Sequence, residues 1–186
     1  IYPASMTKIM TALLTIENLP DLNETITVPE DIFEELTAQD ASVAGFNPYE
    51  QPTVRDLLYG VLLPSGADAC ETLARAVGGS EEGFVAMMNQ KAEELGLTNT
   101  HFENCTGLHN DNHYSTCRDI AVLMSECLKS DTFREIVTRE VYTTEATASH
   151  PEGITLYDTM LHRFTSYEMS TTLENGAVIE GGKTGF

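Results

Sequence analysis

Apolar residues recur at helical spacing over the first two thirds of the chain. Met6, Ile9, Met10 and Leu13 occupy positions i, i+3, i+4 and i+7, which predicts an amphipathic helix with one buried stripe at the start of the sequence. Further helices are predicted at 54–62 after Thr53, at 67–77, at 81–95 after Ser80, and at 117–128 after Thr116. Residues 30–52 and the polar stretch 98–115 are expected to be irregular.

Strand-like stretches are short and lie mostly in the last third. Residues 141–144, 153–156 and 177–180 are rich in β-branched or aromatic residues, and 24–29 is a similar stretch closed by proline. The order predicts an α+β fold in which the helices are segregated from an antiparallel sheet. With 186 residues and 41% apolar content, the chain is expected to form a single domain over residues 1–186.

Charge and composition limit the classes of partner that the chain is expected to bind. The net charge of -19 argues against nucleic acid or an anionic membrane surface as a partner. No run of about 18 apolar residues is present, so no membrane span is predicted within this sequence. The chain opens directly on a helix without Met or a leader, and we therefore expect it to be a piece of a longer chain.

Cysteine and histidine do not form a recognisable metal motif. Cys70 and Cys127 lie in apolar helical contexts and are predicted to be buried thiols. Cys105 and Cys117 flank a loop and could form a disulfide, although a domain of this size favours free thiols. His109 and His113 resemble a zinc-binding pair, but on a polar loop their spacing fixes no geometry, and no metal or cofactor is expected.

Three short segments carry candidate chemistry. Ser5 and Lys8 are three residues apart on a predicted helix, where their Cβ atoms would lie about 5–6 Å apart and a partly desolvated lysine can take the serine proton. Taken alone, Ser5 is more simply explained as a helix cap, and Ser65-Gly66 as a break between helices. The third segment is Lys183-Thr184-Gly185 at the end of a predicted strand. Gly182-Lys183-Thr184 resembles a phosphate loop, but Ala177 stands where that motif needs glycine.

In this order, Ser-x-x-Lys, Ser-Gly-x and Lys-Thr-Gly resemble the serine D-alanyl-D-alanine carboxypeptidases, which are low-molecular-mass penicillin-binding proteins. The similarity covers nearly the whole chain, through residues 4–12, 62–69, 99–102, 106–109, 113–116, 150–154 and 181–186. It implies the β-lactamase/DD-peptidase-like transpeptidase fold, a helical cluster packed on an antiparallel sheet. Family members have strands before the nucleophile helix and after Lys-Thr-Gly, so the domain is expected to be incomplete at both ends.

The resemblance also implies a site. It assigns catalytic roles to Ser5, Lys8 and Ser65, and substrate-binding positions to Ala67, Lys183, Thr184, Gly185 and Phe186. Ser5 would attack the bond between the two terminal D-alanines of a peptidoglycan stem peptide, with Lys8 as base and Ser65 as proton relay. Lys183 and Thr184 would bind the terminal carboxylate, and the backbone N–H groups of Ser5 and Phe186 would hold the oxyanion. These side chains are expected to converge in one cleft.

One position departs from the family and keeps alternatives open. The second motif usually ends in Asn, which would hold a substrate carbonyl, and here that position is Ala67. A β-lactamase on the same scaffold is disfavoured because no Glu is followed by Asn four residues later. A non-catalytic module that binds peptidoglycan or a protein is the other alternative. The family further implies covalent inhibition by β-lactams and export to the cell envelope, with any membrane anchor outside this sequence.

Overall fold

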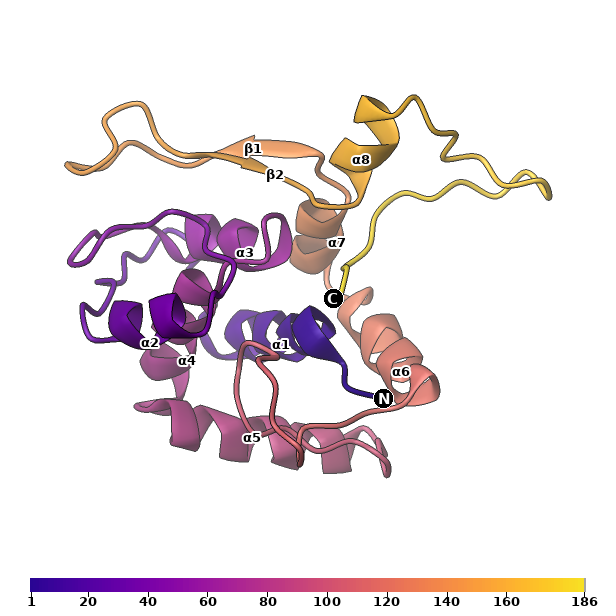
Figure 1. Cartoon of the computed structure of the whole chain (residues 1–186), viewed down its shortest axis with the longest axis horizontal. Helices are drawn as coiled ribbons and strands as arrows, with labels where there is room; N and C mark the ends of the chain where they lie inside the picture. The colour runs from indigo at the N-terminus through magenta and orange to yellow at the C-terminus, as the bar shows by residue number, and fades with distance from the viewer. Residues whose placement is uncertain (186) are drawn as a thin grey trace.

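The computed structural model describes residues 1–185 and places a two-stranded hairpin over one side of a helical body (Figure 1). The helices are η1 (Ala4–Thr7, a 3-10 helix), α1 (Lys8–Asn18), α2 (Ile32–Ala38), α3 (Val54–Leu62), α4 (Ala67–Gly78), α5 (Glu81–Glu94), α6 (Cys117–Cys127), α7 (Asp131–Val137) and α8 (Leu161–Ser166). Strands β1 (Val141–Thr143) and β2 (Thr155–Tyr157) pair antiparallel, with Tyr142 opposite Leu156. No helix within residues 1–185 is long and apolar enough to cross a membrane.

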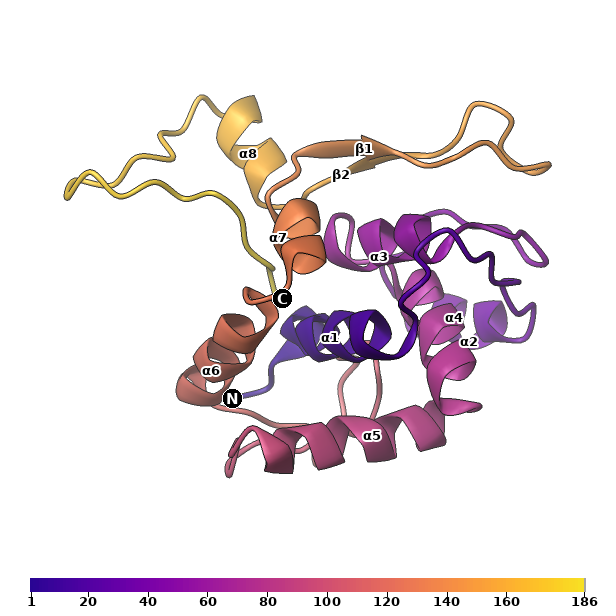
Figure 2. The same cartoon turned by 180° about the vertical axis from the view of Figure 1, so that it is seen from behind.

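Helix α1 is the centre of the molecule. It contacts α3, α4, α5, α6 and α7, which surround it in both views of the ribbon (Figures 1 and 2). Residues 8–15 are all buried, so the expectation of a single buried stripe was too narrow. The polar side of α1 is accommodated by hydrogen bonds: Thr11 Oγ1 donates to the carbonyl of Cys105 at 2.6 Å, and Thr15 Oγ1 donates to that of Thr11 at 2.8 Å.

The predicted helix starts are confirmed. The side-chain oxygens of Thr53, Ser80 and Thr116 each accept a backbone N–H three residues later, at the N-termini of α3, α5 and α6. Thr53 forms a full capping box with Asp56. These signals could be read from sequence because donor and acceptor lie within one turn.

Several other expectations were wrong. Residues 30–52 are not wholly irregular, because α2 forms there and buries Ile32 and Leu36. Residues 24–29 form no regular strand, although Thr25 bridges Thr53 and Val28 bonds to the backbone at 49–50. Residues 177–180 contribute only an isolated bridge between Val178 and Thr172. The hairpin strands predicted at 141–144 and 153–156 are present, while α7 and α8 were not predicted.

The four cysteines are free thiols. Cys70 and Cys127 are buried, as their apolar contexts predicted, and Cys105 is buried as well. Cys117 is exposed at the start of α6, so the alternative of a bridge between Cys105 and Cys117 is wrong.

A single buried carboxylate fastens the hairpin to α3. Asp56 Oδ1 accepts the Tyr142 hydroxyl at 2.9 Å and the Glu145 backbone N–H at 3.2 Å, while its Oδ2 accepts from Thr53. The ring of Tyr142 stacks on Tyr59 with centroids 3.6 Å apart. Asp56 therefore links the α3 cap to β1.

We expect Asp56→Ala to lower the free energy of unfolding by at least about 3 kcal/mol, because it leaves several buried hydrogen-bond donors without an acceptor. Tyr142→Phe removes one bond, leaves the carboxylate partnered, and should cost about 1.5 kcal/mol. Urea unfolding of both variants measures the difference. Equal losses would show that Asp56 acts only through Tyr142.

Candidate active site

The start of the chain positions a serine beside a lysine. Ser5 lies in η1, and the tight 3-10 turn places residues i and i+3 on one side of the backbone. Lys8 Nζ stands 3.4 Å from Ser5 Oγ. Ala4, directly before Ser5, has φ +48, a conformation that costs a non-glycine residue about 1–3 kcal/mol and that often accompanies functional sites.

Lys8 is a buried cation with two hydrogen-bond partners. Its residue is 3% exposed, and its Nζ donates to the carbonyl oxygen of Thr106 at 2.6 Å as well as to Ser5. Thr106 lies in the loop 98–115, which the chain folds back against α1. Sequence reasoning missed this partner, since any residue type can supply a backbone carbonyl.

Ser65 occupies a second unusual backbone position. It has φ +68 just before α4, is 6% exposed, and its Oγ has no hydrogen-bond partner within the described residues. A buried hydroxyl without a partner is costly, so an atom supplied by a ligand would complete it. Ala67, two residues on, is 2% exposed and offers only a methyl group.

The third motif, near the C-terminal end of the chain, lies against the segment that carries the first motif. Thr184 Oγ1 shares a 2.7 Å hydrogen bond with Thr159 Oγ1. A Cβ at Gly185 would stand 2.8 Å from the carbonyl oxygen of Pro3, so only glycine allows this approach to the Ser5 segment. Phe186 lies outside the described residues.

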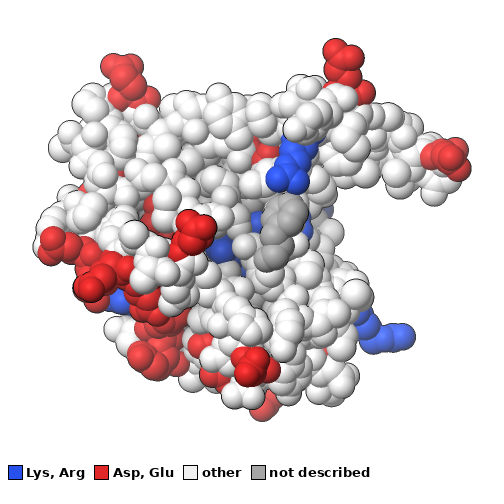
Figure 3. Space-filling view, in the orientation of Figure 1, with Lys and Arg blue, Asp and Glu red and all other residues white. Residues whose placement is uncertain are grey.

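Lys183 lies close enough to Lys8 for the two side chains to repel each other. Burial, followed by the repulsion of Lys8, lowers the pKa of Lys183 to about 8, and its Nζ donates to the Thr184 carbonyl at 3.0 Å. Two cations in one region form a positive spot inside an acidic protein. Figure 3 shows basic atoms near the middle of one face, with acidic side chains gathered toward one side of the same face.

These segments enclose a cavity of about 360 Å³. It is lined by Ser5, Lys8, Asp40, Ala41, Ser42, Pro64, Ser65, Ala67, Thr106, Gly107, Leu108, Thr159, Arg163 and Thr184. Five of the eight residues singled out from sequence thus line one cavity. Lys183 and Gly185 are adjacent to it through the contacts just described.

A second buried carboxylate shapes the cavity wall. Asp68 accepts the backbone N–H groups of Ala44, Gly45 and Phe46 at 2.7, 3.0 and 3.1 Å. Burial raises its pKa, although the three N–H donors act in the opposite direction. Asp68 therefore holds the loop whose residues 40–42 line the cavity, a positioning role that sequence reasoning missed. The available signal was an acidic residue in the first turn of α4, between two alanines.

The histidine pair does not form one site. His113 is buried, and its Nδ1 accepts the Glu103 backbone N–H at 3.1 Å, so the neutral ring carries its proton on Nε2 and donates to Thr7 Oγ1 at 2.7 Å. Burial lowers the His113 pKa to about 4. Both ring nitrogens are thus used inside the protein, while His109 lies 3.5 Å from Asp111 on the surface.

Solved structures show that this helical body with its small antiparallel hairpin has the DD-peptidase fold. The chain is similar to a Streptomyces DD-transpeptidase, with a TM-score of 0.82 and 33% identity over 98% of this chain and 70% of that one. It also resembles penicillin binding protein 6B from Escherichia coli, with a TM-score of 0.76 and 29% identity over 86% of this chain and 50% of that one. The expected fold class is confirmed.

Sequence comparison then fixes the family. The family model described as D-alanyl-D-alanine carboxypeptidase matches residues 1–186, and the chain belongs to that family. The carboxypeptidase DacF of Bacillus subtilis is 41% identical over 146 residues, which are 78% of this chain and 38% of that protein. DacB2 of Mycobacterium tuberculosis is 34% identical over 191 residues, 99% of this chain and 57% of that protein. The chain thus spans roughly two fifths to three fifths of these relatives.

The lowered pKa of Lys183 predicts a pH-dependent stability. Between about pH 8 and pH 10.5 the unfolded chain holds a proton on Lys183 that the folded protein has released. The free energy of unfolding of the wild type should therefore rise across that window relative to Lys183→Met, which cannot titrate. Urea unfolding at several pH values measures the difference. A flat difference would place Lys183 in solvent, away from Lys8.

Proposed function

We propose that this protein is a serine D-Ala-D-Ala carboxypeptidase that removes the terminal D-alanine of peptidoglycan stem peptides through an acyl-enzyme on Ser5. The observation that carries the proposal is Lys8, a buried amine 3.4 Å from Ser5 Oγ in the cleft. Family membership supports the reaction class. Residues 1–186 would form the catalytic domain, exported to the cell envelope.

In the first step, Lys8 acts as the general base and accepts the Ser5 proton while Oγ bonds to the carbonyl carbon of the penultimate D-alanine. The Thr106 carbonyl supports this role, because its 2.6 Å bond holds one Nζ hydrogen and fixes the direction of the amine. The developing oxyanion would receive the Ser5 backbone N–H and that of Phe186. The Phe186 contribution rests on the family pattern alone.

In the second step, the carbon–nitrogen bond breaks and the departing D-alanine takes a proton from Ser65 Oγ, which regains one from Lys8. The lack of a partner on Ser65 Oγ supports this relay. Water then hydrolyses the ester and frees Ser5.

The terminal carboxylate of the peptide would bind near Lys183 and Thr184. An anion beside Lys183 offsets the repulsion of Lys8 and favours the charged ammonium. Arg163 also lines the cavity, so three cations lie at or near it. This local field makes an anionic peptide an acceptable ligand for a chain with net charge -19.

The two alternatives are weaker. A rapidly deacylating β-lactamase on this scaffold employs a Glu to activate water, and among residues 1–185 no Glu lines this cavity, where the carboxylate present is that of Asp40. A non-catalytic module is favoured only by Ala67. The non-catalytic module does not account for the Ser5–Lys8 pair in the cleft, which a β-lactamase would use as well. β-Lactams are accordingly proposed as covalent inhibitors.

Ser5→Ala should abolish covalent labelling by fluorescent penicillin and leave the thermal midpoint nearly unchanged, because Ser5 forms no helix-capping bond. Ser42→Ala, another serine of the cavity wall, should still label. Denaturing gels and thermal scans of the three proteins measure both properties. Persistent labelling of Ser5→Ala would assign the nucleophile elsewhere, and unfolding would favour a structural serine.

Ala67→Asn should raise kcat/KM for a peptide ending in D-Ala-D-Ala by about two- to tenfold, the value of one recovered hydrogen bond to the substrate. Ala67→Leu is the matched control, since it has nearly the same shape without the amide and should not raise the rate. If both substitutions lower the rate equally, the site is crowded and the amide is not the missing group.

A further inference from the structure

A second cluster of reactive side chains lies outside the cleft. Glu71 belongs to α4, Glu81 to α5 and Cys105 to the loop 98–115, yet one ligand atom from each lies within 4.8 Å of the other two. Cys105 Sγ donates to Glu71 Oε1 at 3.3 Å, and the Cys105 backbone N–H donates to Glu81 Oε1 at 3.2 Å. The fold thus gathers a thiol and two carboxylates from three separate segments.

The charge of this cluster is incompletely balanced. The Glu71 side chain is 10% exposed, and its Oε2 is one of two buried side-chain polar atoms without a hydrogen-bond partner in residues 1–185. That oxygen forms an ion pair with Arg75 Nε at 3.6 Å, too long for a hydrogen bond, and the guanidinium is shared with Asp31 at 2.7 Å. Buried carboxylates are normally paired fully or bound to a metal ion.

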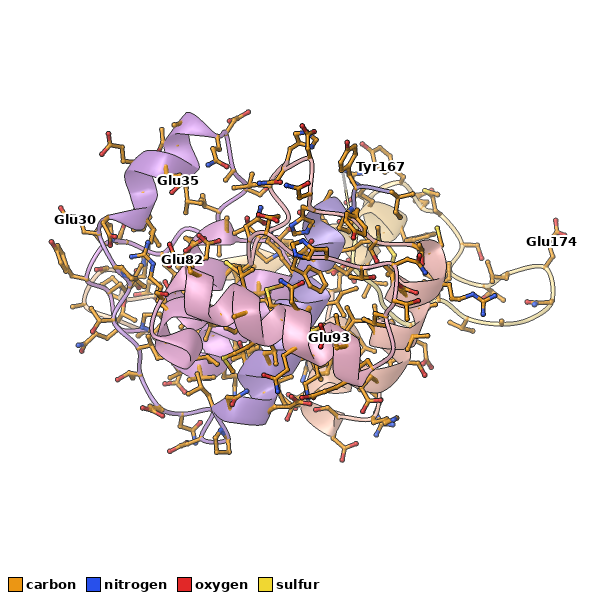
Figure 4. The ribbon with its side chains drawn as sticks, turned by 90° about the horizontal axis from the view of Figure 1, so that it is seen from below. Glu30, Glu35, Glu82, Glu93, Tyr167 and Glu174 are labelled. Atoms are coloured by element: carbon orange, nitrogen blue, oxygen red, sulfur yellow. The ribbon has the colours of Figure 1, made fainter. Side chains whose placement is uncertain are left out.

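The two carboxylates of the cluster are reachable from solvent, whereas Cys105 is fully buried beside them. Glu71 and Glu81 line a cavity of about 230 Å³ together with Glu35, Glu103 and His109. Figure 4 places Glu35 on α2 and Glu82 at the start of α5 on the same side of the molecule, opposite Glu174. An entrance bordered by acidic residues concentrates cations near the cluster.

We propose that Glu71, Glu81 and Cys105 form a binding site for a divalent transition metal ion of the zinc type. The thiol distinguishes this set from the all-oxygen sites that calcium and magnesium prefer. Ligands at zinc bond lengths stand about 3.3–3.8 Å apart in a tetrahedron, so the sulfur–oxygen pair at 3.3 Å already fits. The widest pair lies within 4.8 Å and needs to close by at most about 1.5 Å, and the adjoining cavity has room for water as a fourth ligand.

Binding replaces a hydrogen bond with a coordinate bond. The Cys105 S–H proton, which points at Glu71, leaves to solvent as the sulfur–metal bond forms. The ion would brace the loop beside the cleft, because the Cys105 carbonyl accepts Thr11 Oγ1 and the next carbonyl, of Thr106, accepts Lys8 Nζ. The site does not depend on the proposed peptidase reaction.

The test is metal binding by the reduced, metal-free protein. Calorimetric titration with zinc chloride should give one site, and cobalt(II) should produce a sulfur-to-cobalt charge-transfer band. Cys105→Ser should abolish that band, and Glu81→Gln should weaken zinc binding by about ten- to a hundredfold. Cys117→Ser, at an exposed thiol, and Glu82→Gln, at the exposed neighbour of Glu81, are the matched controls and should bind as the wild type does.

Absence of the charge-transfer band in the folded wild type would overturn the proposal, as would loss of the band in Cys117→Ser but not in Cys105→Ser. Equal weakening by Glu81→Gln and Glu82→Gln would also overturn it, because it would indicate diffuse attraction to the acidic surface. Cys105 is buried, so Cys105→Ser could fail to fold. In that case the zinc affinities of Glu81→Gln and Glu82→Gln test the proposal by themselves. Both variants are expected to fold, because Glu81 is only half-buried and Glu82 is exposed.

Discussion

The hydrogen bond from Lys8 Nζ to the Thr106 carbonyl is the contact on which the rest of the site depends. An amine on a helix surrounded by five others must find a partner inside the protein, and the loop 98–115 provides it. That loop is itself fixed to the same helix. The Cys105 carbonyl accepts Thr11 Oγ1, His113 bonds to Thr7, and a side chain at Gly107 would overlap the Ala4 carbonyl oxygen. Helix and loop therefore form one unit, and Ser5 is positioned by both.

What could be predicted from sequence was mostly local. Caps such as Thr53 and Ser80 involve neighbours within one turn, and three ordered motifs were enough to indicate the cleft. Helix α2 was missed because it buries few apolar residues, so its periodicity is weak. Residues 24–29 depend on a partner segment around 49–53 that their own sequence does not specify. The Thr106 carbonyl and the Glu71–Glu81–Cys105 cluster arise only from tertiary packing, which no local pattern encodes.

Overall charge and local charge have different consequences in this molecule. The excess of acidic residues is a property of the surface, where it affects solubility and the approach of other molecules. The cleft instead places Lys8 and Lys183 near each other with limited solvent, and their mutual repulsion is not cancelled by distant carboxylates. Composition therefore argues against whole classes of partner but could not indicate the sign of the electrostatic field inside the site.

The approach of Gly185 to Pro3 and Met6 has a consequence for how the protein acquires its site. Contacts between segments so distant in sequence carry the largest loop-closure entropy and tend to form after local helices are in place. The helical body could then be assembled while the cleft is still open on one side. During synthesis, Lys183 leaves the ribosome long after α1 has done so. Competence of the site would thus be a late event in folding, separable in time from formation of the core.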